Sequence, residues 1–397
     1  MIRHILKQIW TQRRRNGWIL SELLIVFVLA WYIVDYSFVM AHNRMIPNGY
    51  DISNTFQVTY GNNVNDSTRA DFDRFYNKIK HFQGVQHIFV TSSWSVSPFS
   101  GSYNGGTIQS DSTADSYHAQ YKGIASNGYF NVFKVRSVNT EKLARLDFSD
   151  FNTVVVSQNL ATSLFGKEGA IGKTVFLGKN PYRITDIIEN QKRYAYYQPG
   201  NVIFYPNKIA KMSMSSPEIS IRTGDNFSIE QFKHDVTADI KPYGDIQREQ
   251  EFAEGITKDI RLRNGIMIFF LLNIALGVIG TFWFRNQTRR SEIGLRLALG
   301  SSHRQIQNQY ITEAILILTL AAIPALFINI GVLQADLIQT LGQQVTDSGY
   351  ITDNKWLRFL ITSCITYVLL ALIVGLSAWI PAHRASKTHP VDALRDE

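Results

Sequence analysis

Four long, almost uncharged stretches constrain this chain more than any other feature of its sequence. They cover residues 18–40, 265–284, 314–333 and 357–380, and each is close to the roughly 20 residues that an α-helix needs to cross a bilayer. Because a lipid core offers the backbone no hydrogen-bond partners, such stretches must form helices. The sequence therefore predicts an α-helical membrane protein with four transmembrane helices.

The segment between the first two stretches, residues 41–262, is polar and rich in Asn, Ser, Tyr and Asp. Strand-like alternation at 56–60, helical spacing at 67–82 and a further strand at 85–90 predict an α/β part. Residues 93–205 contain β-rich runs such as TVVVSQNL, KTVFLGK and YRITDII, separated by Gly, Pro and Asn turns. We therefore expect a large α+β domain in which an α/β part flanks a β-rich insertion.

The basic residues indicate how the chain crosses the membrane. The formal net charge is +8, but the surplus Lys and Arg lie beside the apolar stretches and not in the large polar segment. The positive-inside rule places residues 1–17, 285–313 and 381–397 in the cytoplasm, and residues 41–262 and 334–356 outside it. The basicity therefore indicates topology, and we expect no nucleic-acid partner.

Local features suggest how the ends of these stretches are built. Residues 2–12 have the spacing of an amphipathic helix on the membrane surface, with an ordinary packed helix as the alternative. Glu22 and Asp35 lie near the two ends of the first stretch, where a carboxylate reaches the interface, so we interpret them as helix-end residues. A helical stalk from about Gln250 is expected to lead into the second stretch, and the span counted with the end of this stalk covers 263–284. Pro324 is expected to kink the third stretch.

The stretch Thr288–Ser302, TRRSEIGLRLALGSS, is a polar helix held between two apolar stretches. Apolar residues alternate in it with four charged ones, which are Arg289, Arg290, Glu292 and Arg296. Gly300 falls where a helix C-cap is expected, and Ser302 with Gln305 offers a capping box for the next helix. This pattern predicts a docking element rather than an active site.

Motifs for catalysis or metal binding are not legible in the sequence. The run GKEGAIGKT, Gly166–Thr174, has five residues between its glycines where a phosphate-binding loop has four, so we interpret it as a turn that carries lysines. His81, His87 and His118 lack a tight ligand pattern and are interpreted as isolated histidines. We therefore predict no catalytic residue and no metal site in this chain.

Three parts of the chain resemble the MacB-like/FtsX-like family of ABC transporter permeases. They are the stretch RRSEIGLRLALGSSHRQIQNQYITEAIL, the tail PAHRASKTHPVDALRDE, and the middle segment NTVVVSQNLATSLFG followed by AIGKTVFLGKNPYRITDII. The resemblance covers nearly the whole chain. It implies four spans with a large periplasmic domain between the first two, divided into a porter-like α/β part and an inserted β-rich part.

The same resemblance implies a function and a set of partners. Permeases of this family dimerise and bind a pair of cytoplasmic ABC ATPases, whose ATP-driven closure moves the periplasmic domains. This chain is then expected to bind no cofactor itself, with ATP and Mg²⁺ on the ATPase. Expected partners are that ATPase, a second copy or a paralogue, membrane lipids, a periplasmic adaptor and an outer-membrane channel. The implied location is the bacterial inner membrane.

Several residues receive roles through the resemblance. The coupling helix would span about Thr288 to Leu299, and its contacts with the ATPase are assigned to Arg289, Arg290, Glu292, Gly294, Arg296 and Gly300. A second cytoplasmic contact in the tail is assigned to Pro381, Arg384, Pro390 and Leu394. From the residue alone, Asn273 in the second stretch is expected to hydrogen-bond another helix or subunit.

The sequence departs from the exporter that gives the family its name. That protein carries an ATPase domain ahead of the first span, whereas here about 17 residues precede it and no Walker A motif occurs, so we expect the ATPase on a separate chain. Export is the preferred role because the β-rich part resembles the exporter type. Lipoprotein extraction, control of a cell-wall hydrolase and a membrane sensor remain alternatives.

Overall fold

The computed structural model describes residues 13–91, 96–100, 102–110, 115–166, 169–207, 214, 217–288, 299–335 and 354–386. The chain divides into two compact units. The helical unit comprises Met1–Val39, Lys258–Gln339 and Gly349–Glu397, and the sheet unit comprises Met40–Thr257 and Thr340–Ser348. Two units of unlike composition agree with the split between apolar and polar stretches.

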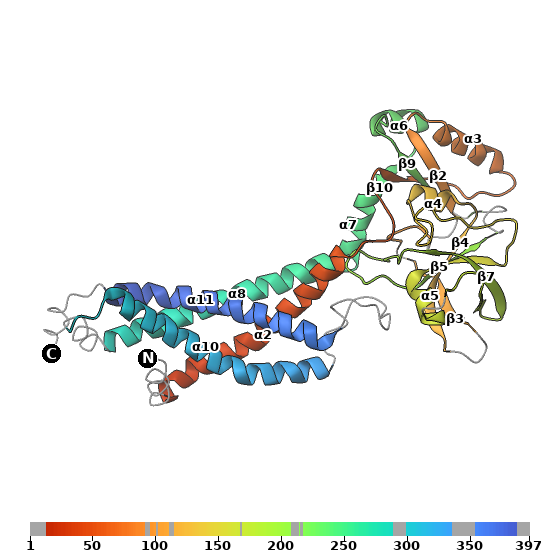
Figure 1. Cartoon of the computed structure of the whole chain (residues 1–397). Coiled ribbons are helices and arrows are strands. Elements are labelled where there is room, and N and C mark those ends of the chain that lie inside the picture. The colour runs from red at the N-terminus through yellow and green to blue at the C-terminus, as the bar shows by residue number, and fades with distance from the viewer. Residues whose placement is uncertain are drawn as a thin grey trace. The chain divides into compact units, whose positions relative to one another are not determined.

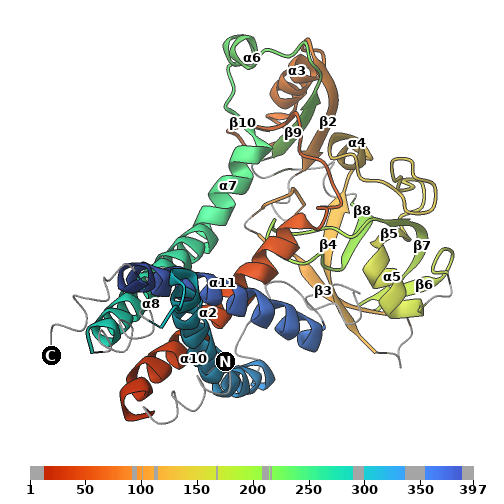
Figure 2. The same cartoon turned by 60° about the vertical axis from the view of Figure 1, so that its left-hand side comes forward.

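The helical unit contains four long helices, which lie side by side in Figures 1 and 2. They are α2 (Arg13–Met45), α8 (Ile256–Thr288), α10 (His303–Gln334) and α11 (Lys355–Ser386). All four are long and apolar enough to cross a membrane, which confirms the predicted class. The structure keeps α10 continuous through Pro324.

The core of the helical unit combines large and small apolar side chains. Leu23 and Phe27 of α2 belong to the same buried cluster as Ile274 of α8. Buried alanines recur along two helices, at Ala314, Ala321 and Ala325 of α10 and at Ala378 and Ala382 of α11. Small residues allow helix backbones to approach closely, which is a main source of packing energy in a bilayer.

The sheet unit contains a four-stranded sheet with strand order β10-β1-β9-β2, shown in Figure 1 together with helices α3 and α6. The elements are β1 (Thr55–Thr59), α3 (Arg69–Lys80), β2 (Val85–Thr91), β9 (Glu218–Thr223), α6 (Ile229–Val236) and β10 (Ile240–Pro242). Strands β1 and β2 each pair antiparallel with β9, which lies between them. This sheet is the expected α/β part, and its last strands come from the far side of the insertion.

The insertion folds into a closed barrel with strand order β3-β4-β8-β5-β7-β6. Its elements are β3 (Gly105–Gln109), β4 (Tyr117–Ile124), α4 (Gly128–Val132), β5 (Thr153–Ser157), α5 (Gln158–Phe165), β6 (Thr174–Leu177), β7 (Asn180–Ile188) and β8 (Val202–Pro206). Two pairings are parallel, β4 with β8 and β5 with β7. Closure leaves the barrel without an unpaired edge. The expected β-rich insertion is confirmed.

The local structure around α5 corrects one expectation and fits another. The run TVVVSQNL was expected to be strand-like, but its second half begins α5, because Ser157 precedes the helix in extended conformation and Gly166 ends it with φ of +63°. Thr174 begins strand β6. A phosphate-binding loop would lead into a helix at this point, so the turn interpretation of this run fits.

The expected stalk from about Gln250 is not one helix. Helix α7 (Tyr243–Ala253) ends there, and α8 begins at Ile256. Gly255 between them has φ of +75°, a conformation that L side chains rarely adopt. The stalk is therefore helical but interrupted at Gly255, a turn that the pattern of polar and apolar residues does not reveal.

The sheet and the barrel share one hydrophobic core. It contains Phe89 of β2, Tyr129 and Phe130 of α4, Phe204 of β8 and Tyr243 of α7. The Tyr129 and Phe204 rings lie 5.0 Å apart, and the Phe89 ring meets Tyr129 edge-on at 5.4 Å. Aromatic contacts of this kind add to the energy of burial. The two parts of the sheet unit are therefore packed together through α4.

Candidate coupling sites

The predicted coupling helix lies for the most part outside the described residues. Arg289, Arg290, Glu292, Gly294 and Arg296 all belong to the part of the chain that the structure does not describe. Their roles stay predictions.

The end of this segment is described. Gly300 has φ of +95°, which fits a left-handed cap position. Ser302 and Gln305 then form a complete capping box, in which each side chain accepts a hydrogen bond from the other residue's backbone N–H. The start of α10 is therefore fixed as the sequence predicts.

Contacts between α8, α10 and α11 surround the two ends of this segment. Gln307 of α10 lies 3.2 Å from His383 Nδ1 of α11, and the His383 ring stacks on Trp379 at 5.2 Å. The guanidinium of Arg384 lies 5.1 Å from the centre of the Trp283 ring in α8. These contacts join the ends of α8, α10 and α11 that flank the segment in sequence.

The four predicted tail residues divide between described and undescribed parts. Pro381 lies inside α11, and its side chain is buried. Arg384 contacts Trp283 as stated above, whereas Pro390 and Leu394 lie outside the described residues. The structure thus brings Arg384 to the base of the coupling segment, and the tail contact with a partner stays a prediction.

A buried charge pair lies between α2 and α11. Asp35 is fully buried, and its Oδ1 lies 3.3 Å from Nε of Arg358, which is 2% exposed. Thr362 donates a hydrogen bond to the same Oδ1 at 3.1 Å and accepts one from the Trp31 indole, also at 3.1 Å. The interpretation of Asp35 as a helix-end residue reaching the interface was therefore wrong. A basic partner 323 positions away, at 358, pairs with the carboxylate inside the protein.

A second polar contact joins α2 to α8. Arg263 forms an ion pair with Asp259 at 2.9 Å within α8. Its guanidinium lies 3.9 Å from the centre of the Tyr36 ring of α2. A guanidinium on an aromatic face is attracted by the ring's electron density, and the attraction strengthens as water is excluded. Two consecutive residues of α2, at 35 and 36, thus contact two different neighbouring helices.

The C-terminal end of α2 is held inside the sheet unit by Lys192. Its Nζ donates hydrogen bonds to the backbone carbonyls of Asn43 and Ile46 and, at 3.3 Å, to that of Ala195. The last carbonyls of a helix lack intrahelical partners, and a cation there is also favoured by the helix dipole. Burial lowers the pKa of Lys192 to about 8. We call this arrangement the α2 clasp.

The clasp includes a second side chain from the same loop between β7 and β8. The carbonyl of Tyr196 accepts a hydrogen bond from Asn43 Nδ2 at 3.1 Å. The Tyr196 hydroxyl accepts another from Arg44 at 2.8 Å, and the Arg44 guanidinium lies 5.3 Å from the centre of that ring. Several bonds from one loop therefore fix the last turn of α2 to the barrel.

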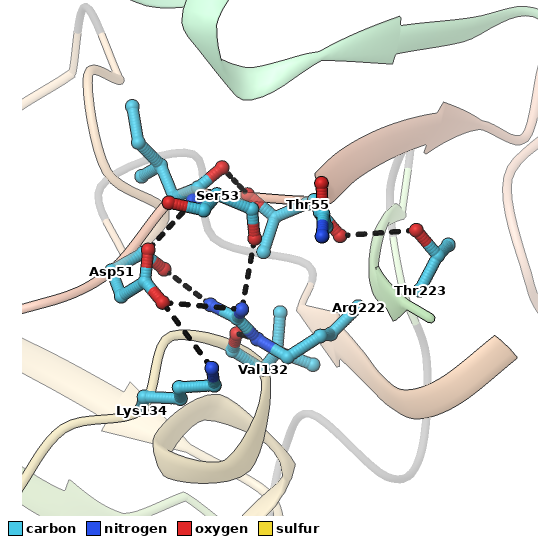
Figure 3. A network of polar contacts seen from close by, with 9 residues as sticks. Asp51, Ser53, Thr55, Val132, Lys134, Arg222 and Thr223 are labelled. Atoms are coloured by element: carbon cyan, nitrogen blue, oxygen red, sulfur yellow. Dashed lines mark hydrogen bonds and ion pairs between the residues drawn. The ribbon is translucent and has the colours of Figure 1, made fainter. Parts of the chain in front are cut away.

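Arg222 of β9 joins the sheet to α4, as Figure 3 shows. This side chain is 3% exposed and donates to the backbone carbonyls of Asp51, Ser53 and Val132 at 2.6, 2.8 and 2.5 Å. It also pairs with the Asp51 carboxylate at 3.3 Å, which Lys134 approaches at 3.5 Å.

The Asp51 carboxylate is kept charged by this network. Partial burial raises its pKa, but hydrogen bonds from Ser53 and the charges of Arg222 and Lys134 outweigh burial and hold the pKa below its usual range. A guanidinium with this many partners fixes the orientation of the backbone around it. The sheet and the barrel are therefore locked by polar contacts as well as by their shared core.

Lys122 of β4 is buried in the core between the sheet and the barrel. Its Nζ donates to the Tyr129 hydroxyl at 3.0 Å and to Gln191 Oε1 at 3.5 Å, and it lies 5.6 Å from the centre of the Phe204 ring. Among the residues that the structure describes, no carboxylate forms an ion pair with it. Burial lowers the pKa of Lys122 to about 7.

Asn273 lies on an exposed face of α8, between exposed Phe269, Leu272 and Leu276. It therefore faces away from the other three helices of its own chain. An amide on the lipid-facing side of a membrane helix is costly unless another molecule hydrogen-bonds it. The prediction that it bonds a helix of the same chain has no support in this position, and the prediction of a contact with another subunit stays open.

Sequence reasoning missed the residues that hold the elements together: Lys122, Lys192, Arg222 and Arg358. One signal was available for Arg358, a basic residue two positions into the fourth apolar stretch. Lys192 stands before a run of tyrosines, RYAYY, and Lys122 lies within a strand-like run. A lysine in such surroundings indicates burial only when its partners are known, and those come from distant parts of the chain.

The comparisons with known proteins agree with this architecture. Residues 23–239, more than half of the chain, match the model of the MacB-like periplasmic core domain. Residues 264–390 match the model of the FtsX-like permease C-terminal domain.

Relatives match over much of the chain at modest identity. The uncharacterised ABC transporter permease YvrN of Bacillus subtilis strain 168 is 24% identical over 303 residues, which cover 70% of this chain and 71% of YvrN. The macrolide export ATP-binding/permease protein MacB 1/2 of Paracoccus denitrificans is 26% identical over 316 residues, 76% of this chain but 45% of that relative. The crystal structure of the periplasmic region of MacB from Actinobacillus actinomycetemcomitans gives a TM-score of 0.33 at 16% identity and covers 51% of this chain and 94% of that one.

The chain belongs to the family of MacB-like and FtsX-like ABC transporter permeases, since one family model covers more than half of it and a second covers most of the rest. Within that family it is a multi-pass membrane protein. Its described residues include four apolar helices, and the match to the MacB-like periplasmic core domain begins inside the first of them and ends before the second.

Proposed function

We propose that this chain passes an ATP-driven conformational change from a cytoplasmic ATPase to its periplasmic domain, in the service of export. The observation that carries the proposal is α2, one uninterrupted helix from Arg13 to Met45 whose residues belong to both units. Its C-terminal turn is held by the α2 clasp rather than by a flexible linker. A movement of α2 therefore has a direct route into the barrel, and through the Arg222 network into the sheet.

The ATPase in this proposal is a separate subunit that carries ATP and Mg²⁺. The names of the relatives support the assignment of the ATPase to a separate subunit. The relatives named as ATP-binding/permease proteins are more than twice the length that this chain matches, whereas the chain covers 71% of YvrN, which is named as a permease only. The segment that includes Glu292 is the proposed contact with the ATPase. The contacts of Trp283 with Arg384 and of Gln307 with His383, on the helices that flank the segment in sequence, support that role.

The proposal also includes a second permease subunit, a cytoplasmic position for both termini, and the bacterial inner membrane as the location. The exposed amide of Asn273 supports a subunit contact along α8. The basic residues beside the apolar stretches support the orientation. In the proposed export role, a periplasmic adaptor and an outer-membrane channel are further partners. If the chain acts instead in lipoprotein extraction or on a cell-wall hydrolase, the same coupling serves a different outer partner.

Co-purification with an ATPase tests the proposal. The full chain, extracted in mild detergent from its native host, is expected to retain an ABC ATPase, and Glu292→Lys is expected to uncouple that subunit's ATP hydrolysis from transport while membrane insertion is kept. Arg261→Glu, an exposed charge reversal at the other end of α8, serves as the matched control and is expected to change neither. Extraction that never retains an ATPase would instead favour a membrane sensor.

A further inference from the structure

A cavity of about 360 Å³ opens in the sheet unit beside the α2 clasp. Its walls come from three places in the chain: Tyr103 ahead of β3, His118 of β4, and the loop that connects β7 to β8. Pockets that bind small molecules begin at about this size, and the volume equals that of roughly a dozen water molecules. None of the contacts proposed above for coupling uses this cavity.

One wall carries a guanidinium that lies close to two aromatic rings. The Arg193 guanidinium lies 4.7 Å from the centre of the Tyr103 ring and 4.9 Å from that of the Tyr194 ring. Among the described residues, none forms an ion pair or a hydrogen bond with it, and its Nε is buried without a partner. Stacking on a ring occupies the faces of a guanidinium and leaves its edge of N–H donors for an oxyanion.

Two buried amides on the same cavity each have one unused group. Gln191 is 1% exposed, and its Nε2 has no hydrogen-bond partner among the described residues, while its Oε1 accepts from Lys122. Asn201 is 8% exposed, and its Oδ1 has no partner either, while its Nδ2 donates to the His118 carbonyl at 3.1 Å. The engaged end of each amide assigns which of its terminal atoms is the oxygen and which the nitrogen. Buried polar groups are normally paired, so two orphans on one cavity point to a missing molecule.

The missing partners define the chemistry of that molecule. Arg193 and Gln191 offer donors, which suit the two oxygens of a carboxylate, whereas Asn201 offers an acceptor, which suits an N–H group. The Tyr103 and His118 rings are stacked at 5.7 Å with planes 23° apart, and they form an aromatic wall. The Tyr194 hydroxyl donates a hydrogen bond to Glu254, whose charge also acts on Tyr197 of the cavity lining.

We propose that this cavity binds an N-acylated amino acid, or the C-terminal residue of a short peptide, through its free carboxylate. Arg193 and Gln191 take the carboxylate, Asn201 takes the amide N–H, and the planar side group lies against Tyr103 and His118. Small rotations of the Gln191 and Asn201 side chains bring their unused groups to the ligand. The site is independent of the coupling function, since its occupancy requires neither the ATPase nor a second subunit.

The test uses the full chain in detergent micelles and N-acetyl-L-phenylalanine as the probe, with N-acetyl-L-phenylalanine amide as its uncharged twin. Isothermal titration is expected to give saturable binding of the acid with a Kd of about 0.5 mM, as for a ligand of this size. The amide is expected to bind about tenfold more weakly or worse, because it lacks the charge-assisted hydrogen bonds. This comparison needs no variant, so it does not depend on how a mutant folds.

Variants then place the binding at the cavity. Arg193→Gln is expected to weaken binding of the acid at least about tenfold, and Arg193→Lys to weaken it less, because charge remains but the two-donor edge is lost. Arg74→Gln, which removes an exposed arginine from α3, is the matched control and is expected to leave the Kd unchanged. Equal binding of acid and amide, unchanged binding in Arg193→Gln, or no saturable binding of the acid would each overturn the proposal.

Discussion

Lys122 and Lys192 have different hydrogen-bond partners in the sheet unit, and burial lowers their pKa values to different extents. Lys192 finds backbone carbonyls at the end of a helix, and burial lowers its pKa only to about 8. Lys122 finds a hydroxyl, an amide oxygen and two aromatic faces, and burial lowers its pKa to about 7. The pKa of Lys122 falls further because Lys122 is the more deeply buried of the two.

Lys122 gives the stability of the protein a defined pH dependence. Its folded pKa of about 7 lies below the ordinary value of 10.5, so between these values the unfolded chain binds a proton that the folded chain does not. Stability must then rise with pH across this window. We expect Lys122→Met to unfold at a higher temperature than the unmodified chain near pH 6, with the difference shrinking toward pH 10.

Thermal unfolding of the full chain in detergent at several pH values measures this effect. The exposed Lys142→Met is the control and should follow the unmodified chain at every pH. If the unfolding temperature of Lys122→Met exceeds that of the unmodified chain by the same amount at every pH, folding does not change the pKa of Lys122.

The pair of Asp35 and Arg358 offers a second test at the scale of single residues. Arg358→Leu leaves a carboxylate buried between helices without its partner, and Asp35→Asn leaves a guanidinium there. Each is expected to lower the free energy of unfolding by about 3–5 kcal/mol. The double variant removes both charges and is expected to recover most of that loss. Unfolding free energies of the four proteins give the coupling directly.

The exposed pair of Asp71 and Arg74 supplies the comparison, since surface ion pairs contribute little. Additive losses in the Asp35 and Arg358 cycle, as small as those of the surface pair, would mean that the two buried groups do not depend on each other.

Among individual residues, the sequence predicts those whose role is local. The capping box of Ser302 and Gln305 is complete in the structure because both partners lie within one turn. The role of Asp35 was misjudged because its partner lies on another helix, at position 358. A carboxylate near the end of an apolar stretch looks the same in sequence whether it reaches water or an arginine.

Helix α8 is the most exposed of the four long helices. In its apolar segment 17% is buried inside the protein, against 50% in that of α2. Lipid alone explains the exposed Leu and Phe side chains, but it does not explain Asn273 among them. The amide therefore singles out one face of α8 as the place where a second subunit would bind.

Cysteine cross-linking tests this face of α8. In a Cys364→Ser background, which removes the single native thiol, Asn273→Cys is expected to yield a disulfide-linked dimer on mild oxidation in the membrane. Leu372→Cys on α11 is 60% exposed and serves as the control, which should remain monomeric. Equal cross-linking at the two positions would reflect random collision, and a monomer at 273 would place the interface elsewhere.

Whole elements were predictable where periodicity decides their type. The four apolar helices follow from the length of the uncharged stretches, and helix α3 follows from the helical spacing at 67–82. Helix α5 was not separated from the strand before it, since QNLATSLF directly follows the buried strand residues of β5 without a turn. The break at Gly255 was missed because a single glycine is compatible with both a helix and a turn.

At the scale of the molecule, the sheet unit depends on pairings between distant segments. The barrel closes through parallel pairs of β4 with β8 and of β5 with β7, and β9 enters the sheet from the far side of the insertion. The pattern of strands predicts a β-rich insertion but not which strands pair, because side-chain alternation carries no information about the neighbour. The cavity beside the clasp was beyond prediction for the same reason, since its walls come from three separate segments.

Movement of the periplasmic domains on ATP binding is the central claim, and a distance between two copies tests it most directly. A spin label at Asp73→Cys, exposed on α3, in the Cys364→Ser background reports the separation of the two sheet units in the complex with the ATPase. We expect ATP with Mg²⁺ to shift the distance distribution, and Lys192→Met to diminish that shift while ATP hydrolysis continues, because the α2 clasp is weakened. Identical distributions with and without ATP, in a complex that hydrolyses it, would contradict the account.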